Sequence, residues 1–411
     1  MSRISHLYPR PGGSITGTLL LSLVVALCLA FCPACCSTPR PLKLSTLNKR
    51  LEDTSDPFVY EGPGEIVLHM ESDIAMPQGP GVVTAEAFIS DILGQPRPLA
   101  IYTPPGYDPE RPEPYPVIYA LHGFGGRYTM WLPLVSPLEE TFEAGTIPEA
   151  VIVMVDFSLS GTGIDDPDTY YDERGGSFYI NTNQGRFEDH FFDELVPFVT
   201  ERYHVRTDAE GVVLIGASMG GYGTLWYGIT HPDFSHILIP IFPPADLRYS
   251  IEGNRLENYD PARYEPVTTD DPYRIVNASV LWGCFGVTEE FIYYAVFDSD
   301  KEPGEVWTDD LPVWRRFQEY NPVEVLAEEQ PDLTGQRYFI IAGDEDDFNL
   351  DAHIPIVVPL LEAAGATVSP PEGERITPGG RHNAEFVEVR KDEIFQWLGD
   401  EIRAGEGPAD E

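Results

Sequence analysis

The sequence predicts an α/β domain: one mostly parallel sheet with helices on both faces, behind an N-terminal targeting segment. Two observations point to this fold class. Short apolar runs rich in β-branched residues recur along the chain, and such runs are typical of strands buried on both faces. Stretches with apolar residues at helical spacing separate many of these runs. Strands that alternate with helices form βαβ units, and βαβ units build a parallel sheet.

Length and composition agree with a folded domain and exclude several partners. The chain has 411 residues, of which 42% are hydrophobic and 12% aromatic, so it can bury a large core. Its formal net charge is −41. This charge argues against nucleic acid as a partner and against docking of the folded body on an anionic membrane, because both would repel it. It indicates a solvated acidic surface suited to a salty or extracellular medium.

Residues 1–36 are predicted to be a signal peptide or a lipoprotein signal. Arg3 and Arg10 precede an apolar run over 19–31, which has the length of a signal h-region, and small residues follow it. We therefore expect an exported protein, which is periplasmic, a cell-envelope lipoprotein or extracellular. The sequence leaves open simple secretion, a retained membrane anchor, and lipid attachment to a cysteine. The candidate cysteines for lipid attachment are Cys32, Cys35 and Cys36.

A tether and the catalytic domain follow the signal. Residues 37–80 are rich in Pro, Gly and charge, which predicts a flexible tether, and residues 81–411 form the domain. Only Cys284 lies in this body, so no disulfide within the domain is available. The predicted strands are 98–108, 115–126, 150–158, 212–218, 235–243, 336–346 and 374–380. The predicted helices are 187–205, 223–231, 353–366 and 386–402.

Two of these stretches are the clearest. "AVIVMVDFS", residues 150–158, reads as a buried parallel strand. In the helix over 187–205 the apolar residues recur at helical spacing, with acids on the other face. These apolar residues are Phe191, Leu195, Phe198 and Val199.

The alternation of strands and helices stops between residues 243 and 335, where the sequence turns aromatic and charged. We interpret this interval as a lid-like insertion over the C-terminal edge of the sheet, the edge at which α/β sheets bind ligands. Its aromatic residues either line an acyl or aryl pocket or fill the core of the lid itself. They include Trp282, Phe285, Phe291, Tyr293, Tyr294, Trp307 and Trp314.

The stretch "VVLIGASMGGYG", residues 212–223, contains the candidate nucleophile. Gly216, Ser218 and Gly220 form a Gly-x-Ser-x-Gly pattern between an apolar strand and a helical stretch. When a strand turns sharply into a helix, the residue at the turn is strained and its neighbours two positions away must lack side chains. The turn projects the serine oxygen at the N-terminal end of the helix, where amides and the helix dipole favour negative charge. A plain structural turn is the alternative.

A serine nucleophile needs a base and an acid, which follow it in the order Ser, Asp or Glu, His. His382 lies in the loop "PGGRHN" directly after the last predicted strand and is the preferred base. His231 and His236 follow the nucleophile helix and are expected to point away, and His353 is expected to be a surface or capping residue. Asp346 is the preferred acid, because its spacing from Gly343 leaves room for a turn toward His382. Asp344 and Asp347 remain possible, although most acids of this run must face solvent.

Two backbone amides are predicted to form the oxyanion hole. The amide of Met219, directly after the nucleophile, is one donor, and the amide of Phe124 in "LHGFGG" is the other. His122 precedes Ser218 in the sequence, so a structural role is expected for it.

No cofactor is expected. The chain has no Cys/His cluster that suggests zinc and no glycine loop that would cradle phosphate. Asp166, Asp168 and Asp172 are spaced loosely like a calcium loop but lack its glycine and terminal Glu, so we interpret them as a solvated acidic loop.

Together these motifs resemble the esterase D-like branch of the α/β-hydrolases, which includes S-formylglutathione hydrolases, feruloyl, acetylxylan and enterochelin esterases and the antigen 85 mycolyltransferases. The resemblance covers about residues 87–402 and depends on the order of the set. The motifs are "YTPPGYD", "YALHGFGG", "GSFYINTNQGRFEDHFFDELVPFV", "IGASMGGYGTL", "AGDEDDF" and "GGRHN". This resemblance implies the α/β-hydrolase fold. It also implies a catalytic triad of Ser218, Asp346 and His382, with Phe124 and Met219 as oxyanion donors. The glutathione-directed members are compact and cytosolic, without a signal or a long insertion. This chain departs from them on both counts, which favours a general exported carboxylesterase.

The function predicted from the sequence is therefore that of a serine hydrolase cleaving carboxylic esters through an acyl-enzyme. Its expected substrate is a small-molecule or carbohydrate-linked ester, with a membrane approached only through an N-terminal lipid anchor. Two alternatives stay open: an acyltransferase of the mycolyltransferase type, and a non-catalytic envelope protein that binds a partner through the inserted segment. The sequence does not indicate an oligomeric state.

Overall fold

The computed structural model describes residues 68–69, 79–158, 176–182, 185–247 and 319–405. The predicted signal, most of the predicted tether, Cys284, the three aspartates of the acidic loop and the aromatic residues of the insertion lie outside these ranges. Within them, Leu68–His69 form β1, a short strand inside the interval predicted as tether. No helix of this part of the chain has both the length and the apolar character that a membrane span needs.

One sheet organises the described residues. Its order is β1-β2-β3-β5-β4-β8-β9-β10-β12. The pairs β1–β2, β2–β3 and β3–β5 are antiparallel, and all pairs from β5 to β12 are parallel. The strands after β1 are β2 (Val82–Ser90), β3 (Gln95–Thr103), β4 (Val117–Leu121), β5 (Val151–Val155), β8 (Val212–Ala217), β9 (Ile237–Ile241), β10 (Arg337–Phe339) and β12 (Thr367–Ser369). The predicted fold class, a mostly parallel sheet between helices, is confirmed.

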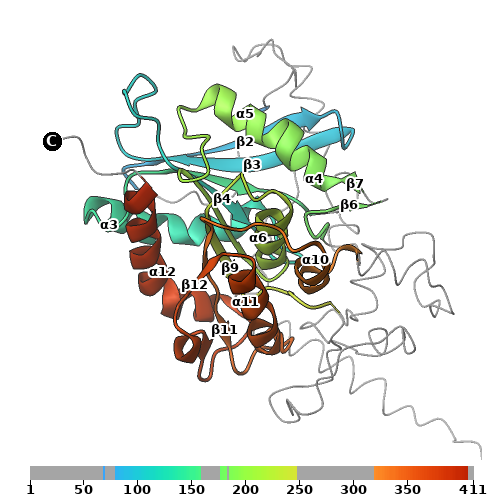
Figure 1. Ribbon diagram of the computed structural model, residues 1–411. Helices are drawn as coiled ribbons and strands as arrows, with labels where there is room; N and C mark the ends of the chain where they lie inside the picture. Colours follow the sequence, from blue (N-terminus) through green and yellow to red (C-terminus); the bar gives the residue numbers. More distant parts are fainter. Residues whose placement is uncertain (1–67, 70–78, 159–175, 183–184, 248–318, 406–411) are drawn as a thin grey trace, which may run out of the picture. The chain divides into compact units, whose positions relative to one another are not determined.

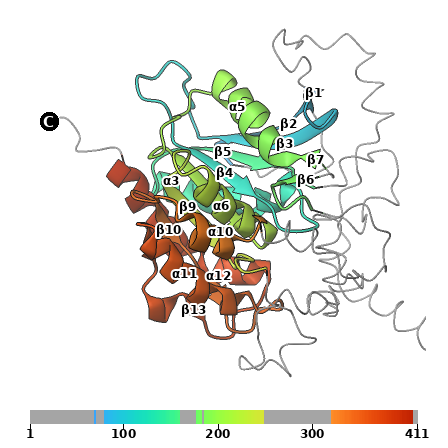
Figure 2. The ribbon, with the colours of Figure 1, turned by 45° about the vertical axis from the view of Figure 1, so that its right-hand side comes forward.

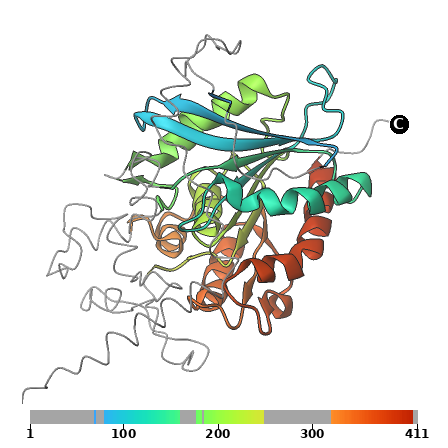
Figure 3. The same cartoon turned by 180° about the vertical axis from the view of Figure 1, so that it is seen from behind.

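Helices cover both faces of this sheet. Figures 1 and 2 show α5, α6, α10 and α11 over one face, and Figure 3 shows α3 and α12 side by side over the other. Arg403 near the end of α12 donates to the carbonyls of Gly145 and Thr146, which follow α3. The helices are α3 (Val135–Glu143), α4 (Phe187–Asp189), α5 (Val196–Arg202), α6 (Met219–Thr230), α10 (Pro322–Glu329), α11 (Ile354–Ala363) and α12 (Ala384–Gly405). The 3₁₀ and π-helical segments are η1 (Tyr128–Leu134), η4 (His190–Leu195), η7 (Leu350–His353) and η8 (Glu372–Glu374).

The central strands are buried because their residues are apolar on both faces. Every residue of β4, β5, β8 and β9 is buried, as the runs of valine, isoleucine and leucine predict. The helix predicted over 187–205 is present as α4, η4 and α5, in which η4 is a π-helical turn. Its four predicted core residues are all buried.

Three details of the sheet differ from the prediction, and the first is β2, a strand that was not predicted. The run over 374–380 does not extend the main sheet: its strand β13 (Ile376–Thr377) pairs with β11 (Ala342–Gly343) in a separate two-stranded sheet. The last strand of the main sheet is β12, a three-residue strand without the apolar signal on which the prediction depended. A further small sheet joins β6 (Asn181–Thr182) to β7 (Gly185–Arg186).

The predicted insertion over 243–335 is described only at its two ends. Val323, Leu326 and Leu333 belong to the core, and α10 contacts both α6 and α11. The lid-like interpretation therefore stays a prediction for 248–318, which lie outside the described residues.

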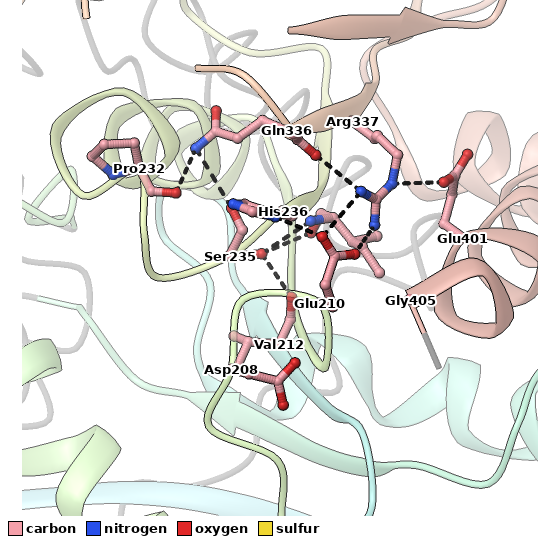
Figure 4. A network of polar contacts seen from close by, with 12 residues as sticks. Asp208, Glu210, Val212, Pro232, Ser235, His236, Gln336, Arg337, Glu401 and Gly405 are labelled. Atoms are coloured by element: carbon pink, nitrogen blue, oxygen red, sulfur yellow. Dashed lines mark hydrogen bonds and ion pairs between the residues drawn. The ribbon is translucent and has the colours of Figure 1, made fainter. Parts of the chain in front are cut away.

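An ion-pair network joins the segments that enter the parallel strands (Figure 4). Glu210, two residues before β8, accepts from His236 before β9 and from Arg337 at the start of β10. Arg337 also contacts Glu401 of α12 at 2.7 Å. Because parallel strands begin at the same edge, this network lies at the edge opposite to the one where β8 ends. At about 3.3 Å per residue, β8 alone separates the two edges by roughly 20 Å.

Candidate active site

The bend predicted around Ser218 is present at the carboxyl end of β8. Ser218 has φ 59° and ψ −120°, a backbone conformation rare for a residue with a side chain, and it lies between β8 and α6. A Cβ atom on Gly216 would lie 2.1 Å from the carbonyl oxygen of Gly220, and one on Gly220 would lie 2.1 Å from that of Leu121. Both flanking positions therefore require glycine, for the reason the motif predicts.

The structure brings Asp346 and His382 together. The Nδ1–H of His382 donates to Oδ2 of Asp346 at 2.8 Å, and both side chains are almost completely buried. The other carboxylate oxygen of Asp346 accepts the amides of Phe348 and Leu350. These bonds fix the carboxylate, and the carboxylate holds the proton of the imidazole on Nδ1, which leaves Nε2 as an acceptor.

The neighbouring acids have other partners. Asp344 accepts the amide of Gly379, and Asp347 pairs with Arg381 at 2.8 Å. Neither of these carboxylates is buried, and His382 forms its ion pair with Asp346 and with neither of them. Within the run, Asp346 is therefore the carboxylate that orients this imidazole.

The end of β9 links the Ser218 bend to His382. The amide of Ser218 donates to the carbonyl of Ile241 at 3.0 Å, and the ring of the next residue, Phe242, lies 4.2 Å from the ring of His382. The ring of Phe348 contacts His382 from another side at 4.7 Å. The Ser218 hydroxyl makes no hydrogen bond to a described residue, so the contact between Ser218 and His382 stays a prediction. Catalytic hydrogen bonds are often long before substrate binds.

The two predicted oxyanion donors belong to adjacent segments. A Cβ atom on Gly123 would lie 3.4 Å from Cβ of Ser218, so the loop that carries Phe124 approaches the bend closely. A Cβ atom on Gly176 would contact the side chains of both Met219 and Phe124. Met219 is the first residue of α6, where helical amides have no intrahelical partner. Among the described residues, neither the Met219 amide nor the Phe124 amide donates a hydrogen bond.

Three other histidines have structural partners, as expected. Buried His122 accepts the amide of Phe157 on Nε2 and donates from Nδ1 to the carbonyl of Gly123. Burial lowers its pKa, so it stays neutral in this role. His231 and His236 pair with glutamates away from the bend.

The expectation that His353 is a surface residue was wrong, whereas the capping alternative agrees with its place: it is the N-cap residue of α11, although its side chain makes no capping hydrogen bond to that helix. Its side chain is buried, and Nδ1 accepts the amides of Ala245 at 3.1 Å and Asp246 at 2.9 Å. Nearby, Asn321 donates to the carboxylate of Asp246 and accepts the amide of Leu247. Sequence reasoning missed this cluster because its members lie far apart in the chain and carry no local pattern.

Acidification is expected to destabilise the protein through His353. Burial lowers the pKa of His353 to about 4, whereas a histidine of the unfolded chain titrates near 6.5. Between these values the unfolded chain takes up a proton that the folded protein excludes. The stability that neutral His353 contributes is therefore present above about pH 6.5 and is lost as the pH falls toward 4.

This expectation is measured by urea unfolding at pH 7.5 and pH 4.5. The matched variant is His353→Asn, whose amide oxygen can accept the same backbone amides but does not titrate. Between the two pH values we expect the wild type to lose about 2 kcal/mol more unfolding free energy than the variant. Equal losses in the two proteins would contradict the expectation.

Metal ligation has no candidate in this part of the protein. No group of three or more His, Cys, Asp or Glu side chains among the described residues could hold a metal ion. The loosely calcium-like Asp166, Asp168 and Asp172 lie outside these residues.

Comparison with known proteins gives a family match and several relatives. The model of the family described as "Putative esterase" matches residues 90–368. The S-formylglutathione hydrolase of Paracoccus denitrificans is 27% identical over 150 residues, which are 35% of this chain and 50% of that protein. An endo-1,4-beta-xylanase/feruloyl esterase of Xylanibacter ruminicola is 26% identical over 160 residues, which are 37% of this chain and 20% of that protein. The chain thus spans at most half the length of these two curated relatives.

A solved structure supports the fold. An S-formylglutathione hydrolase from Agrobacterium tumefaciens aligns with a TM-score of 0.53 over 80% of this chain and 99% of its own. Its sequence is 15% identical, so this likeness bears on the fold alone.

Proposed function

This chain belongs to the esterase family whose model it matches, and from that premise we propose that it is an exported serine carboxylesterase. The observation that carries the proposal is the hydrogen bond between Asp346 and His382, beside the strand end whose carbonyl accepts the amide of Ser218. A buried carboxylate, an imidazole oriented by it and a serine on a strained bend are the parts of a triad. Export is proposed from the signal pattern of residues 1–36.

In the proposed reaction, Nε2 of His382 takes the proton of the Ser218 hydroxyl as Oγ attacks the ester carbonyl. Asp346 holds the imidazole in the tautomer that this step needs and stabilises the imidazolium that forms. The carbonyl oxygen becomes an oxyanion, which accepts from the amides of Phe124 and Met219. His382 then gives the proton to the departing alcohol, and the acyl group stays on Ser218.

Water completes the proposed cycle. It attacks the acyl-enzyme with His382 again as the base, and the acid leaves as Ser218 recovers its proton. Each oxyanion donor of this kind typically contributes about 3 kcal/mol to the stabilisation of the transition state. Because both donors are backbone amides held by neighbouring segments, they need no rearrangement during the reaction.

The names of the relatives support the proposed substrate class only in part. Those names mention S-formylglutathione, which is a thioester, and a feruloyl ester, which share an acyl carbonyl that a serine can attack. We propose a small-molecule or carbohydrate-linked carboxylic ester, because the signal pattern directs this chain away from the compartment of glutathione metabolism.

The test combines turnover with labelling. The chain without its predicted signal is assayed with p-nitrophenyl acetate, butyrate and octanoate, methyl ferulate and S-formylglutathione. In parallel, a fluorophosphonate is added and the tryptic peptide that contains Ser218 is measured by mass spectrometry. We expect hydrolysis of at least one short ester and a covalent mass increase on Ser218.

Two outcomes would contradict the proposal. Absence of turnover and of labelling would favour a non-catalytic protein on the same fold. Transfer of the acyl group to an added sugar or alcohol in preference to water would favour an acyltransferase.

A further inference from the structure

The loop that carries the Phe124 amide is held at both ends by one short segment. This loop, residues 122–127, follows β4, and the segment, residues 156–158, follows β5. At the first end, Nε2 of His122 accepts the amide of Phe157 at 2.8 Å. At the other end, Nη1 of Arg127 lies 3.6 Å from Oδ2 of Asp156. Both anchors therefore depend on the segment that begins at Asp156.

Asp156 is itself fixed by a second arginine. Arg97 on β3 is 1% exposed, and its Nη2 lies 3.4 Å from Oδ1 of Asp156. The same Nη2 donates to the carbonyls of Asp156 and Ser158. Oδ1 of Asp156 also accepts the amide and the hydroxyl of Ser158. The carboxylate thus has one oxygen bound to Arg97 and Ser158 and the other directed toward Arg127.

The charge of Asp156 favours the contact with Arg127. Burial would raise the pKa of Asp156, but the attraction of Arg127 and Arg97 outweighs burial and holds the pKa below its usual value. The carboxylate is therefore ionised at neutral pH. Removing one cationic partner from a buried carboxylate raises the free energy of the folded protein. Conformations that keep Arg127 in place are therefore favoured.

The loop needs such anchors because its interior is intrinsically loose. Three of the four residues between His122 and Arg127 are glycines, which restrict the backbone less than any other residue. Phe124 lies between them, two residues after one anchor and three before the other. One bond inside the loop, from the Gly126 amide to the Gly123 carbonyl at 2.9 Å, closes a turn around Phe124, and the two anchors fix that turn relative to the sheet.

We propose that Asp156 is a positioning residue, which acts through Arg127 and the Phe157 amide to aim the Phe124 amide at the developing oxyanion. The inference rests on the proposed function, since it needs an oxyanion to form. Such a positioning role differs in its kinetic effect from a role in stabilising the fold alone. An oxyanion donor acts on the transition state, so a displaced donor lowers kcat and leaves KM nearly unchanged.

The experiment compares Asp156→Asn, Arg127→Met and Arg127→Lys with the wild type in steady-state hydrolysis of p-nitrophenyl acetate. Loss of an oxyanion donor lowers kcat by about 100- to 1000-fold in a serine hydrolase, and a displaced donor should cost less. We expect kcat to fall about 10- to 100-fold in D156N and R127M, with KM within about twofold of the wild type. R127K keeps the charge and should recover part of the loss.

The matched control is Arg337→Met, which removes ion pairs with Glu210 and Glu401 at the opposite edge of the sheet. Its melting temperature should fall as in D156N, while its kcat stays that of the wild type. If D156N does not fold, R127M decides, because the Arg127 side chain is 18% exposed and tolerates replacement better.

The outcomes separate this inference from the proposed function. An inactive wild type would contradict the proposed function. Suppose that the wild type is active and the Ser218→Ala variant is inactive. If D156N and R127M then have the same kcat as the wild type, the inference about Asp156 is overturned and the proposed function is not. A raised KM with unchanged kcat in R127M would also overturn it, because Arg127 would then bind substrate instead of positioning the loop.

Discussion

Replacing Ser218 by alanine is expected to lower kcat for p-nitrophenyl acetate by about 10⁴- to 10⁶-fold, to the rate left by oxyanion stabilisation and binding alone. The reason is geometric as well as chemical. The bend at φ 59° presents Ser218 at the start of α6, and alanine at this position has no hydroxyl that could form the acyl-enzyme. The expected rate is too low for steady-state measurements. The rate of p-nitrophenol release is therefore measured with enzyme in excess of substrate.

The control for this variant is its fold. Alanine keeps the Cβ of serine, and the requirement for positive φ is the same for both residues, so the melting temperature should change little. Fluorophosphonate should no longer modify the peptide. Retention of more than about one hundredth of wild-type activity, with purity established, would assign the nucleophile to another residue.

Replacing Asp346 by asparagine is expected to give the second largest loss, about 10⁴-fold in kcat near pH 7. Asparagine has almost the same shape, but its amide group can present N–H to Nδ1 of His382. The imidazole would then carry its proton on Nε2 and could no longer accept one from Ser218. The backbone amides of Phe348 and Leu350 need an acceptor, which fixes the asparagine oxygen on their side and its nitrogen on the side of His382.

The chain offers two matched controls for this substitution. Asp344→Asn and Asp347→Asn remove a carboxylate within two residues of Asp346, but these carboxylates bind Gly379 and Arg381. We expect both controls to keep kcat within about threefold of the wild type, since exposed charges contribute little to a site that they do not contact. A loss in D347N or D344N as large as in D346N would contradict the assignment of the acid.

Much of the fold could be predicted because its signals are local. Central parallel strands must be apolar on both faces, so β4, β5, β8 and β9 are visible as uninterrupted apolar runs. The bend at Ser218 is visible for a similar reason, because a strained turn demands glycine at fixed offsets. The link between Asp346 and His382 could be proposed from their order in the chain.

The strands and buried polar residues that the sequence did not indicate depend on partners that are distant in the chain. β12 is the edge strand beside β10, with only three residues and none of them buried, and β2 is partly exposed, so neither carries a strong apolar pattern. Buried polar residues are harder still to predict from the sequence. A histidine such as His353 has the same local sequence whether its imidazole faces solvent or accepts two backbone amides. Arg97 gave one signal that could have been used: an arginine inside an apolar strand needs a buried acid nearby, and Asp156 directly follows another such strand.

The bonds from Asn321 to Asp246 and Leu247 have a consequence for how this protein can diversify. They bring two points of the chain into contact although more than seventy residues separate them in sequence. The entropy of closing such a loop grows only with the logarithm of its length, so halving the intervening chain changes the free energy by about 0.6 kcal/mol. The two ends of this interval should therefore stay joined in a variant in which the interval has another length, so its length is free to vary in evolution.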